Sequence, residues 1–129
     1  MDRLFLDANV LFSAAYRSRA GLLKLWNLPN IEICTSRYAL EEARVNLSEE
    51  EQRRRLKNLS AKLRFVEAGA GKPPAGIILP EKDVPILLAA IEARATHLIT
   101  GDVRHFGPHF GRHVAGVLIC SPGDYFRKL

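Results

Sequence analysis

The sequence predicts an α/β fold, with a mainly parallel β-sheet covered by helices on both faces in a three-layer α/β/α sandwich. Short apolar segments, typical of buried strands, alternate along the chain with segments that carry apolar residues at helical spacing. The length of 129 residues suits a single domain spanning residues 1–129. The Gly- and Pro-rich stretch at 68–75 is expected to be a loop, because it is too short for a domain linker.

Five segments have the apolar composition of buried strands. They lie at residues 4–6, 31–35, 63–67, 97–100 and 114–120. Helices are expected between them, at residues 11–16, 20–26 and 36–47, from residue 48 onward, and at 85–95.

Several helix starts have recognisable capping residues. Ser36 is suited to accept a hydrogen bond from a free amide in the first turn. Ser48 and Glu51 have the spacing of a capping box. Asp83 precedes a proline in the first turn of its helix, and Asp124 is also interpreted as a helix cap.

Composition excludes a disordered chain, since 47% of the residues are hydrophobic and 26% are charged. No apolar run approaches the roughly 20 residues of a membrane span, and no signal peptide is recognisable. A cytoplasmic protein is therefore expected. The net charge of +5 and the pI of about 9.6 are compatible with a polyanionic partner such as nucleic acid. They fit a basic protein without such a partner equally well.

The two cysteines, Cys34 and Cys120, lie in or beside expected strands. The sequence has no CxxC motif and no Cys/His cluster, which makes a structural zinc site an unfavourable interpretation. Both are predicted to be buried free thiols.

Three aspartates lie at strand or helix ends where ligands bind in α/β sheets. Asp7 follows the first strand in the segment LFLDANVLFSA, and Asp102 follows the fourth after LITG. Both are expected at the carboxyl edge of the sheet. Asp83 begins the helix before the fourth strand. Each also has a simpler interpretation, Asp7 as a turn residue and the other two as helix caps.

A fourth acid is expected on the helix at 36–47. Glu42 shares a face with Tyr38 and Val45, which is interpreted as the inward face. Glu41 lies about 100° around the helix, on a wetter face with Arg44. Only one of the two glutamates can face inward, and Glu41 is the alternative.

Converging carboxylates repel one another, and a divalent cation removes that penalty. Oxygen ligands favour Mg²⁺ or Mn²⁺ over zinc. Such an ion can activate water and neutralise charge on a phosphodiester. Asn9 and Thr100 could orient a carboxylate or a bound water without adding charge.

Four segments together resemble the PIN-domain ribonucleases, including the VapC-type toxins of toxin–antitoxin pairs. They are LFLDANVLFSA, TSRYALEEARVNL, KDVPILLAAIEARATHLITGD and RHFG. The resemblance implies a parallel sheet with strand order 3-2-1-4-5 and a metal-dependent site that cleaves RNA. The residues at the positions of the family's acidic cluster are Asp7, Glu42, Asp83 and Asp102, with Asn9 and Thr100 at supporting polar positions.

The resemblance carries further expectations. Many relatives have an additional acid at the position of Arg104, so one well-defined cation is expected here, with any second ion recruited by the substrate. A homodimer and a cognate antitoxin protein are also implied. The implied strand order separates Cys34 from Cys120 by three strands, roughly 14 Å at 4.8 Å per strand, which is too far for a disulfide.

Basic residues provide candidate RNA contacts. Arg53 and Arg54 lie on the helix that begins near residue 48, and Arg104 and His105 follow Asp102 closely. Phosphate neutralisation dominates such binding. The basic side chains of this helix could equally form a solvated face. His105 could also act as a general acid, but no other feature of the sequence supports that role.

The leading hypothesis is therefore a Mg²⁺- or Mn²⁺-dependent endoribonuclease that uses a metal-activated water, in the setting of a toxin–antitoxin pair. One alternative is a catalytically inactive module that binds RNA or a protein. Another is a phosphatase with Asp7 as nucleophile. Such enzymes usually need a second aspartate two residues on, where this chain has Asn9.

Overall fold

The centre of the molecule is a sheet whose strands follow the order β3-β2-β1-β4-β6-β5 in the computed structural model, which describes residues 1–67 and 70–129. The strands are β1 (Asp2–Leu6), β2 (Ile31–Ser36), β3 (Arg64–Val66), β4 (His97–Ile99), β5 (His113–Val114) and β6 (Val117–Cys120). All are parallel to their neighbours except β5, which pairs antiparallel with β6. The α/β class is confirmed, and the five parallel strands lie in the expected order.

The single strand expected at 114–120 is wrong, because the chain turns within it. Ala115 and Gly116 both have positive φ angles, 50° and 87°. Two such residues form a tight hairpin turn between antiparallel strands. The segment therefore contributes the edge strand β5 as well as β6.

The helices lie mostly where the periodicity predicted them. They are α1 (Ala8–Tyr16), α2 (Arg37–Asn46), α3 (Glu50–Ser60), α4 (Val84–Glu92) and α5 (Pro122–Arg127), with 3-10 turns η1 (Gly21–Asn27), η2 (Glu81–Asp83) and η3 (Gly107–His109). The helix expected at 20–26 is thus a 3-10 helix. Of the expected loop at 68–75, Ala68 and Gly69 lie outside the described residues. No described helix is both long and apolar enough to span a membrane.

The capping predictions had mixed outcomes. Ser36 caps α2, since its Oγ accepts a hydrogen bond from the Ala39 amide at 3.1 Å. The capping box at Ser48 is wrong by one position. The backbone N–H of Glu49 donates to the side chain of Gln52, whose Nε2 in turn donates to a carbonyl of α1. Glu49 and Gln52 thus form the capping box with which α3 begins.

Asp124 does not cap the last helix. Ser121 takes that role, because its Oγ accepts from the Asp124 amide at 3.1 Å. The Asp124 carboxylate instead pairs with Arg127 one turn along α5.

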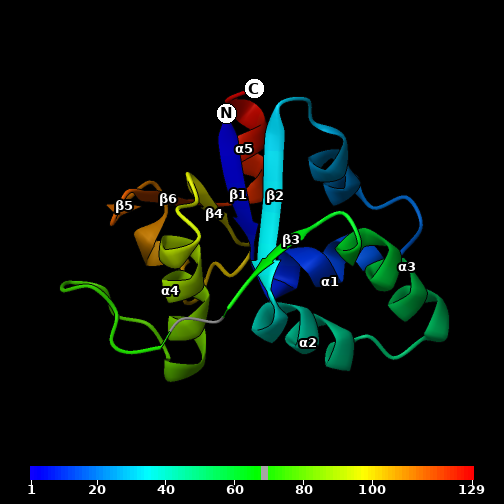
Figure 1. Ribbon diagram of the computed structural model, residues 1–129, viewed down its shortest axis with the longest axis horizontal. Helices are drawn as coiled ribbons and strands as arrows, with labels where there is room; N and C mark the ends of the chain where they lie inside the picture. The colour runs from blue at the N-terminus through cyan, green and yellow to red at the C-terminus, as the bar shows by residue number, and fades with distance from the viewer. Residues whose placement is uncertain (68–69) are drawn as a thin grey trace.

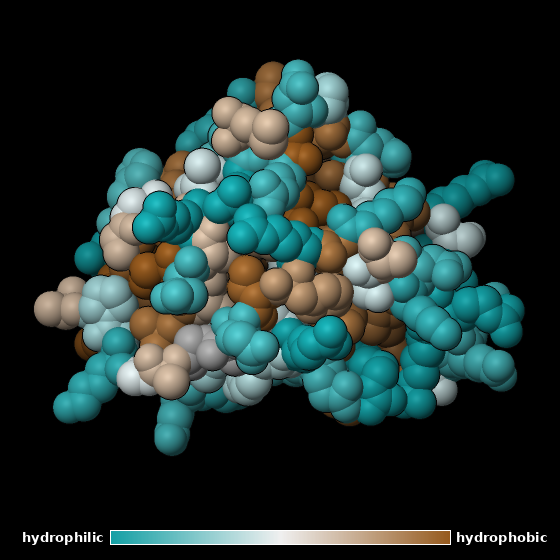
Figure 2. Space-filling view, in the orientation of Figure 1, coloured by the Kyte–Doolittle hydropathy of each residue, from teal (hydrophilic) through white to brown (hydrophobic). Residues whose placement is uncertain are grey.

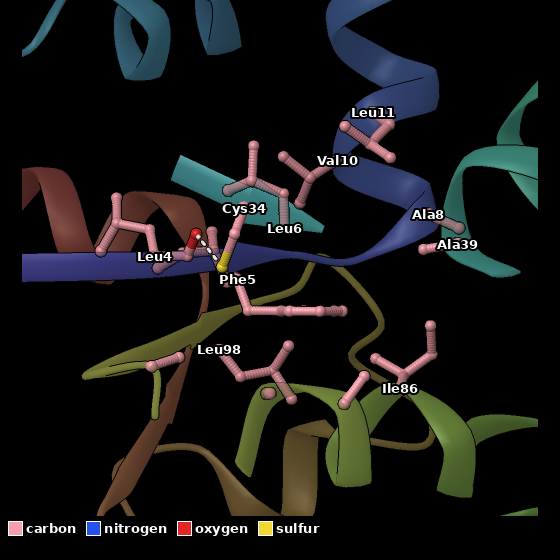
Figure 3. Packing of buried hydrophobic residues seen from close by; sticks show 14 of the residues in the cluster. Leu4, Phe5, Leu6, Ala8, Val10, Leu11, Cys34, Ala39, Ile86 and Leu98 are labelled. Carbon is pink, nitrogen blue, oxygen red and sulfur yellow. Dashed lines mark hydrogen bonds between the residues drawn. The ribbon is translucent and has the colours of Figure 1, made fainter. Parts of the chain in front are cut away.

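The core lies on both faces of β1, which is buried over its last three residues. Figure 3 shows Leu6 on the side of Val10 and Leu11 of α1, and Phe5 on the opposite side with Leu98 of β4 and Ile86 of α4. Alternate residues of a strand point to opposite faces. The two helices therefore cover opposite faces of the sheet, and Figure 1 shows α2 and α3 beside α1.

Both cysteines are buried free thiols, as predicted. Cys34 lies on β2 and Cys120 on β6, with β1 and β4 between them. Burial raises the pKa of each thiol to about 11. Figure 3 shows the Sγ of Cys34 donating a hydrogen bond to the carbonyl of Leu4, at 3.5 Å.

The surface is mixed in character. On the face shown in Figure 2, hydrophilic residues project around the outline and apolar residues lie between them. The large apolar residues that are exposed come from separate elements, for example Tyr16 on α1, Val45 on α2 and Ile78 in the loop before α4. The two termini lie at the same end of the molecule (Figure 1).

Candidate metal centre

Asp7 is positioned by the register of the two central strands. Leu6 of β1 is paired with Ile99 of β4, so the next residues, Asp7 and Thr100, leave the sheet side by side. The Asp7 carboxylate is 3% exposed and fully engaged. Its Oδ1 accepts from the Ala8 amide at 2.7 Å, and its Oδ2 accepts from the Thr100 hydroxyl at 2.8 Å.

The charge on Asp7 is nevertheless disfavoured. Burial raises the pKa of this carboxyl to about 6, and the negative charges of Asp83 and Glu42 act in the same direction. The hydrogen bonds from Thr100 and Ala8 lower the pKa but do not offset burial. A nearby cation would favour the ionised form.

Asn9 and Thr100 connect the two strand ends, as the sequence suggested. The Asn9 side chain donates to Oδ2 of Asp7 at 3.2 Å and accepts from the Gly101 amide at 2.7 Å. The Thr100 hydroxyl also accepts from the Asp102 amide at 3.1 Å. A Cβ at Gly101 would lie 3.3 Å from the Asn9 oxygen, so glycine permits this close approach. Together these bonds orient the loop that carries Asp102.

Asp83, which the sequence left open as a helix cap or a site residue, stands at the N-cap position of α4. It precedes α4, but its carboxylate makes no capping hydrogen bond. The residue is 6% exposed, and its Oδ2 is buried with no hydrogen-bond partner among the described residues. Burial raises the pKa of this carboxyl, and the charge of Asp102 adds to the shift. A buried, unpartnered carboxylate oxygen is costly unless something positive binds it.

Asp102 forms a local turn with His105. Its Oδ1 accepts from the His105 amide at 3.0 Å, and its Oδ2 lies 3.0 Å from Nδ1 of the imidazole. The same Nδ1 lies 3.2 Å from Oδ2 of Asp83. Asp83, Asp102 and His105 each place one potential ligand atom within 4.8 Å of the others.

Glu42 is half buried and is not a member of this group of potential ligands. It lines a cavity of about 310 Å³ together with Asn9 and Phe12. The negative charge of Glu42 contributes to the raised pKa of Asp7, so Glu42 lies on the side of α2 that faces Asp7. Glu41 instead pairs with Arg44 on the exposed side.

The stripe used to place Glu42 is partly wrong. Val45 is 56% exposed, and α2 buries Ala39 and Ala43 instead. Tyr38, the other member of the stripe, donates its hydroxyl proton to the carbonyl of Lys82 at 2.6 Å. That bond ties α2 to η2, and so fixes Glu42 relative to Asp83. Apart from the shared face of Tyr38 and Glu42, no sequence pattern indicates this link.

The candidate RNA contacts have different surroundings. Arg53 donates to the Leu47 carbonyl at 2.8 Å, and Arg54 pairs with Glu51 on the same helix. Arg104 is exposed beside the cluster, and His105 lies within it. RNA binding by any of them stays a prediction.

Comparisons with known proteins agree with this architecture. A family model described as PIN domain matches residues 3–104, a span that includes all four acids. The chain belongs to the PIN-domain family. No curated protein matches it.

Three solved structures share the PIN-domain fold at low sequence identity. VapBC2 from Rickettsia felis, bound to a DNA fragment from its promoter, matches with a TM-score of 0.70 and 18% identity, over 92% of this chain and 98% of that chain. FitAB bound to the IR36 DNA fragment gives 0.59 and 16%, over 92% and 94%. VapBC-1 from nontypeable Haemophilus influenzae gives 0.55 and 17%, over 81% and 90%.

The cluster in this PIN domain suits a hard divalent cation. Carboxylate oxygens are the ligands that such ions prefer. The pKa values of Asp7 and Asp83 are both raised, and Asp83 carries the buried oxygen that has no hydrogen-bond partner among the described residues. These carboxylates can therefore bind a cation at the carboxyl edge of the sheet.

Proposed function

We propose that this PIN domain is an endoribonuclease that depends on Mg²⁺ or Mn²⁺ and acts as the toxin of a toxin–antitoxin pair. The observation that carries the proposal is Oδ2 of Asp83, which is buried without a hydrogen-bond partner among the described residues and is grouped with Asp102 and His105 at the carboxyl edge of the sheet. The PIN family match supports a nuclease, and the sequence resemblance to VapC-type toxins supports RNA as substrate.

In this proposal Asp7, Asp83 and Asp102 hold the cation, and Glu42 completes the acidic set at the mouth of the site. When bound, the ion lowers the pKa of a water and neutralises charge on the scissile phosphate. Asn9 and Thr100 keep the Asp7 carboxylate oriented through the hydrogen bonds described above.

The residues around the cluster have separate tasks. Glu42 is accessible enough to accept a proton from the attacking water. Arg53, Arg54 and Arg104 supply positive charge for the RNA backbone, where phosphate contacts dominate affinity. Their present pairing with protein groups means that Arg53 and Arg54 must exchange partners to bind phosphate.

An antitoxin protein is the proposed partner. The VapBC and FitAB complexes among the structural matches support this part. The proposal also includes a homodimer, on the basis of the family resemblance, and a cytoplasmic location, on the basis of the sequence.

The deciding experiment compares cleavage of structured RNA by the wild-type protein, Asp7→Asn and Asp83→Asn, each with Mg²⁺, with Mn²⁺ and with a chelator. Asp124→Asn, which changes an exposed acid on α5, is purified in parallel as the control. The proposal expects cleavage by wild type and the control only, and only with metal.

Three other results would contradict the proposal. Equal cleavage by all four proteins would identify a contaminating nuclease. RNA binding without cleavage by wild type would indicate the inactive binding module. Phosphate release from a small phosphomonoester, lost in Asp7→Asn, would indicate the phosphatase, although both Asp7 oxygens are already hydrogen-bonded and buried.

A further inference from the structure

The His105 imidazole occupies a position that the proposed reaction does not account for. Its Nδ1 lies 3.0 Å from Oδ2 of Asp102 and 3.2 Å from Oδ2 of Asp83. A single Nδ1–H can point at only one of these oxygens, and the oxygen of Asp83 is left without a hydrogen bond. The three atoms thus lie within 4.8 Å of one another, and the Asp83 oxygen has no hydrogen-bond partner among the described residues.

The spacing of these atoms matches that of neighbouring ligands around a metal ion. An octahedral ion with bonds of about 2.1 Å has adjacent ligand atoms separated by about 3.0 Å. The two nitrogen–oxygen separations, 3.0 and 3.2 Å, are close to this value. Two carboxylate oxygens and one ring nitrogen could therefore share one ion with little movement.

The ring is held in place by the main chain. The His105 amide donates to Oδ1 of Asp102 at 3.0 Å, and the next amide, of Phe106, donates to the Asp102 carbonyl at 3.0 Å. The Phe106 side chain is fully buried and anchors the turn in the core. Metal ligands on such a fixed turn need little ordering when the ion binds.

We propose that Nδ1 of His105 is a further protein ligand of the cation, next to Asp83 and Asp102. The inference rests on the proposed function, because it requires a cation at this cluster. A nitrogen ligand changes the expected metal. Oxygen-only sites suit Mg²⁺, whereas imidazole favours transition metals, whose affinities rise from Mn²⁺ through Co²⁺. The site therefore prefers Mn²⁺ or Co²⁺ to Mg²⁺.

The test is a spectroscopic measurement of the ligand atoms. Mn²⁺ is bound to the wild-type protein, and electron spin echo modulation is used to detect coupling between the ion and a ¹⁴N nucleus of imidazole. The same spectrum is recorded for His105→Ala, for His105→Asn and for His113→Ala, which changes an exposed histidine on β5. Circular dichroism establishes that each variant is folded.

The proposal expects imidazole coupling in wild type and in His113→Ala, and its loss in both His105 variants. Calorimetry should show Mn²⁺ affinity falling about 10- to 100-fold in His105→Ala, with a smaller change for Mg²⁺. His105→Asn can still hydrogen-bond to Asp102 but offers an oxygen ligand. It should therefore lose the preference for Mn²⁺ over Mg²⁺ if His105 ligates the ion.

Failure of this inference can be told apart from failure of the proposed function. Mn²⁺ bound to wild type without imidazole coupling, or coupling that persists in His105→Ala, would overturn the role of His105 and leave the cation site intact. No binding of Mn²⁺ to folded wild-type protein would overturn both.

Discussion

Asp7 illustrates the conflict between stability and function at the level of one residue. Its carboxyl has a pKa of about 6, against an ordinary value of 3.8, chiefly because it is buried. At pH 7, without a cation, the ionised Asp7 carboxylate is less favourable in the folded protein than in the unfolded chain. The difference between the two pKa values corresponds to about 3 kcal/mol of lost free energy of unfolding.

Asp7→Asn should therefore stabilise the metal-free protein at pH 8. The gain should be about 1–3 kcal/mol, since the amide removes the buried charge but weakens some hydrogen bonds of Asp7. The destabilisation by Asp7 is absent below pH 3.8, grows as the pH rises to about 6, and is complete above that value. The stability difference between variant and wild type should thus appear between these two values. Urea denaturation in chelator, from pH 4 to pH 8, measures it.

Asp124→Asn is the matched control, because the pKa of Asp124 is lowered by its hydrogen bond to Arg127. Its removal should not stabilise the protein at any pH. If Asp7→Asn changed the free energy of unfolding by the same amount at pH 4 and pH 8, the raised pKa of Asp7 would be contradicted.

Thr100 should be nearly as important for cation binding as the acids. Thr100→Val keeps the volume but removes the hydroxyl that donates to Asp7 and accepts from the Asp102 amide. Cation affinity and RNA cleavage should each fall about 10- to 100-fold. Calorimetry with Mn²⁺ and the cleavage assay measure the two effects.

Thr96 provides the control at the other end of β4, where its hydroxyl bonds to Arg3. Thr96→Val should lower stability without changing cation affinity. Equal cation affinity in Thr100→Val and wild type would show that the hydroxyl does not orient the acids.

At the scale of one element, α2 carries Glu42 and depends on its cap. Ser36→Ala should lower the free energy of unfolding by about 1 kcal/mol, because the Ala39 amide loses its partner. Ser48→Ala changes an exposed serine that precedes α3 and should have almost no effect. Chemical denaturation of both variants tests this, and equal effects from the two serines would contradict it.

The elements also show what the sequence could predict and what it could not. The spacing of apolar residues located the parallel strands and most helices, because the residues that each element buries must recur with the period of that element. The hairpin at Ala115 and Gly116 was missed because residues 114–120 are otherwise mostly apolar and resemble one strand. Helix α3 begins later than the Ser48 motif predicted because Glu49 and Gln52 form its capping box. The Ser48–Glu51 pair has the same spacing, so spacing alone could not choose between the two, and the contact of Gln52 with α1 favours the second.

The same limit applies to the site. Asp7 and Asp102 could be located from the sequence, since parallel strands end at one edge. Asp83 was ambiguous because a cap and a ligand need the same residue type at that position, and only the missing cap bond separates them. The position of His105 between two carboxylates depends on side-chain packing within a turn, for which the sequence carries no periodic signal.

At the scale of the whole molecule, the sheet keeps the two cysteines apart. Both thiols should fail to react with a thiol reagent such as DTNB in the folded protein at pH 8, because they are buried and have pKa values of about 11. Both should react at once in denaturant. Absorbance counts the thiols in each state, and rapid reaction of either in the folded protein would contradict the burial.

The four acids Asp7, Glu42, Asp83 and Asp102 are brought together only by the fold of the whole sheet and its helices. They come from the end of β1, from α2, from η2 and from the loop after β4. These segments meet only when β1, β2 and β4 are paired in register and Tyr38 ties α2 to η2. Loss of cleavage in a variant is therefore informative only when its fold has been measured independently.

The buried charge of Asp7 has a consequence for how such a protein changes over generations. A substitution that neutralises this residue leaves the chain folded and, without a cation, more stable. Stability alone cannot retain the aspartate, so only selection on the chemical activity can do so. If that selection is relaxed, substitutions of this aspartate should accumulate in such a PIN domain. The resulting protein would be more stable and could still bind its partners, but it would no longer be catalytically active.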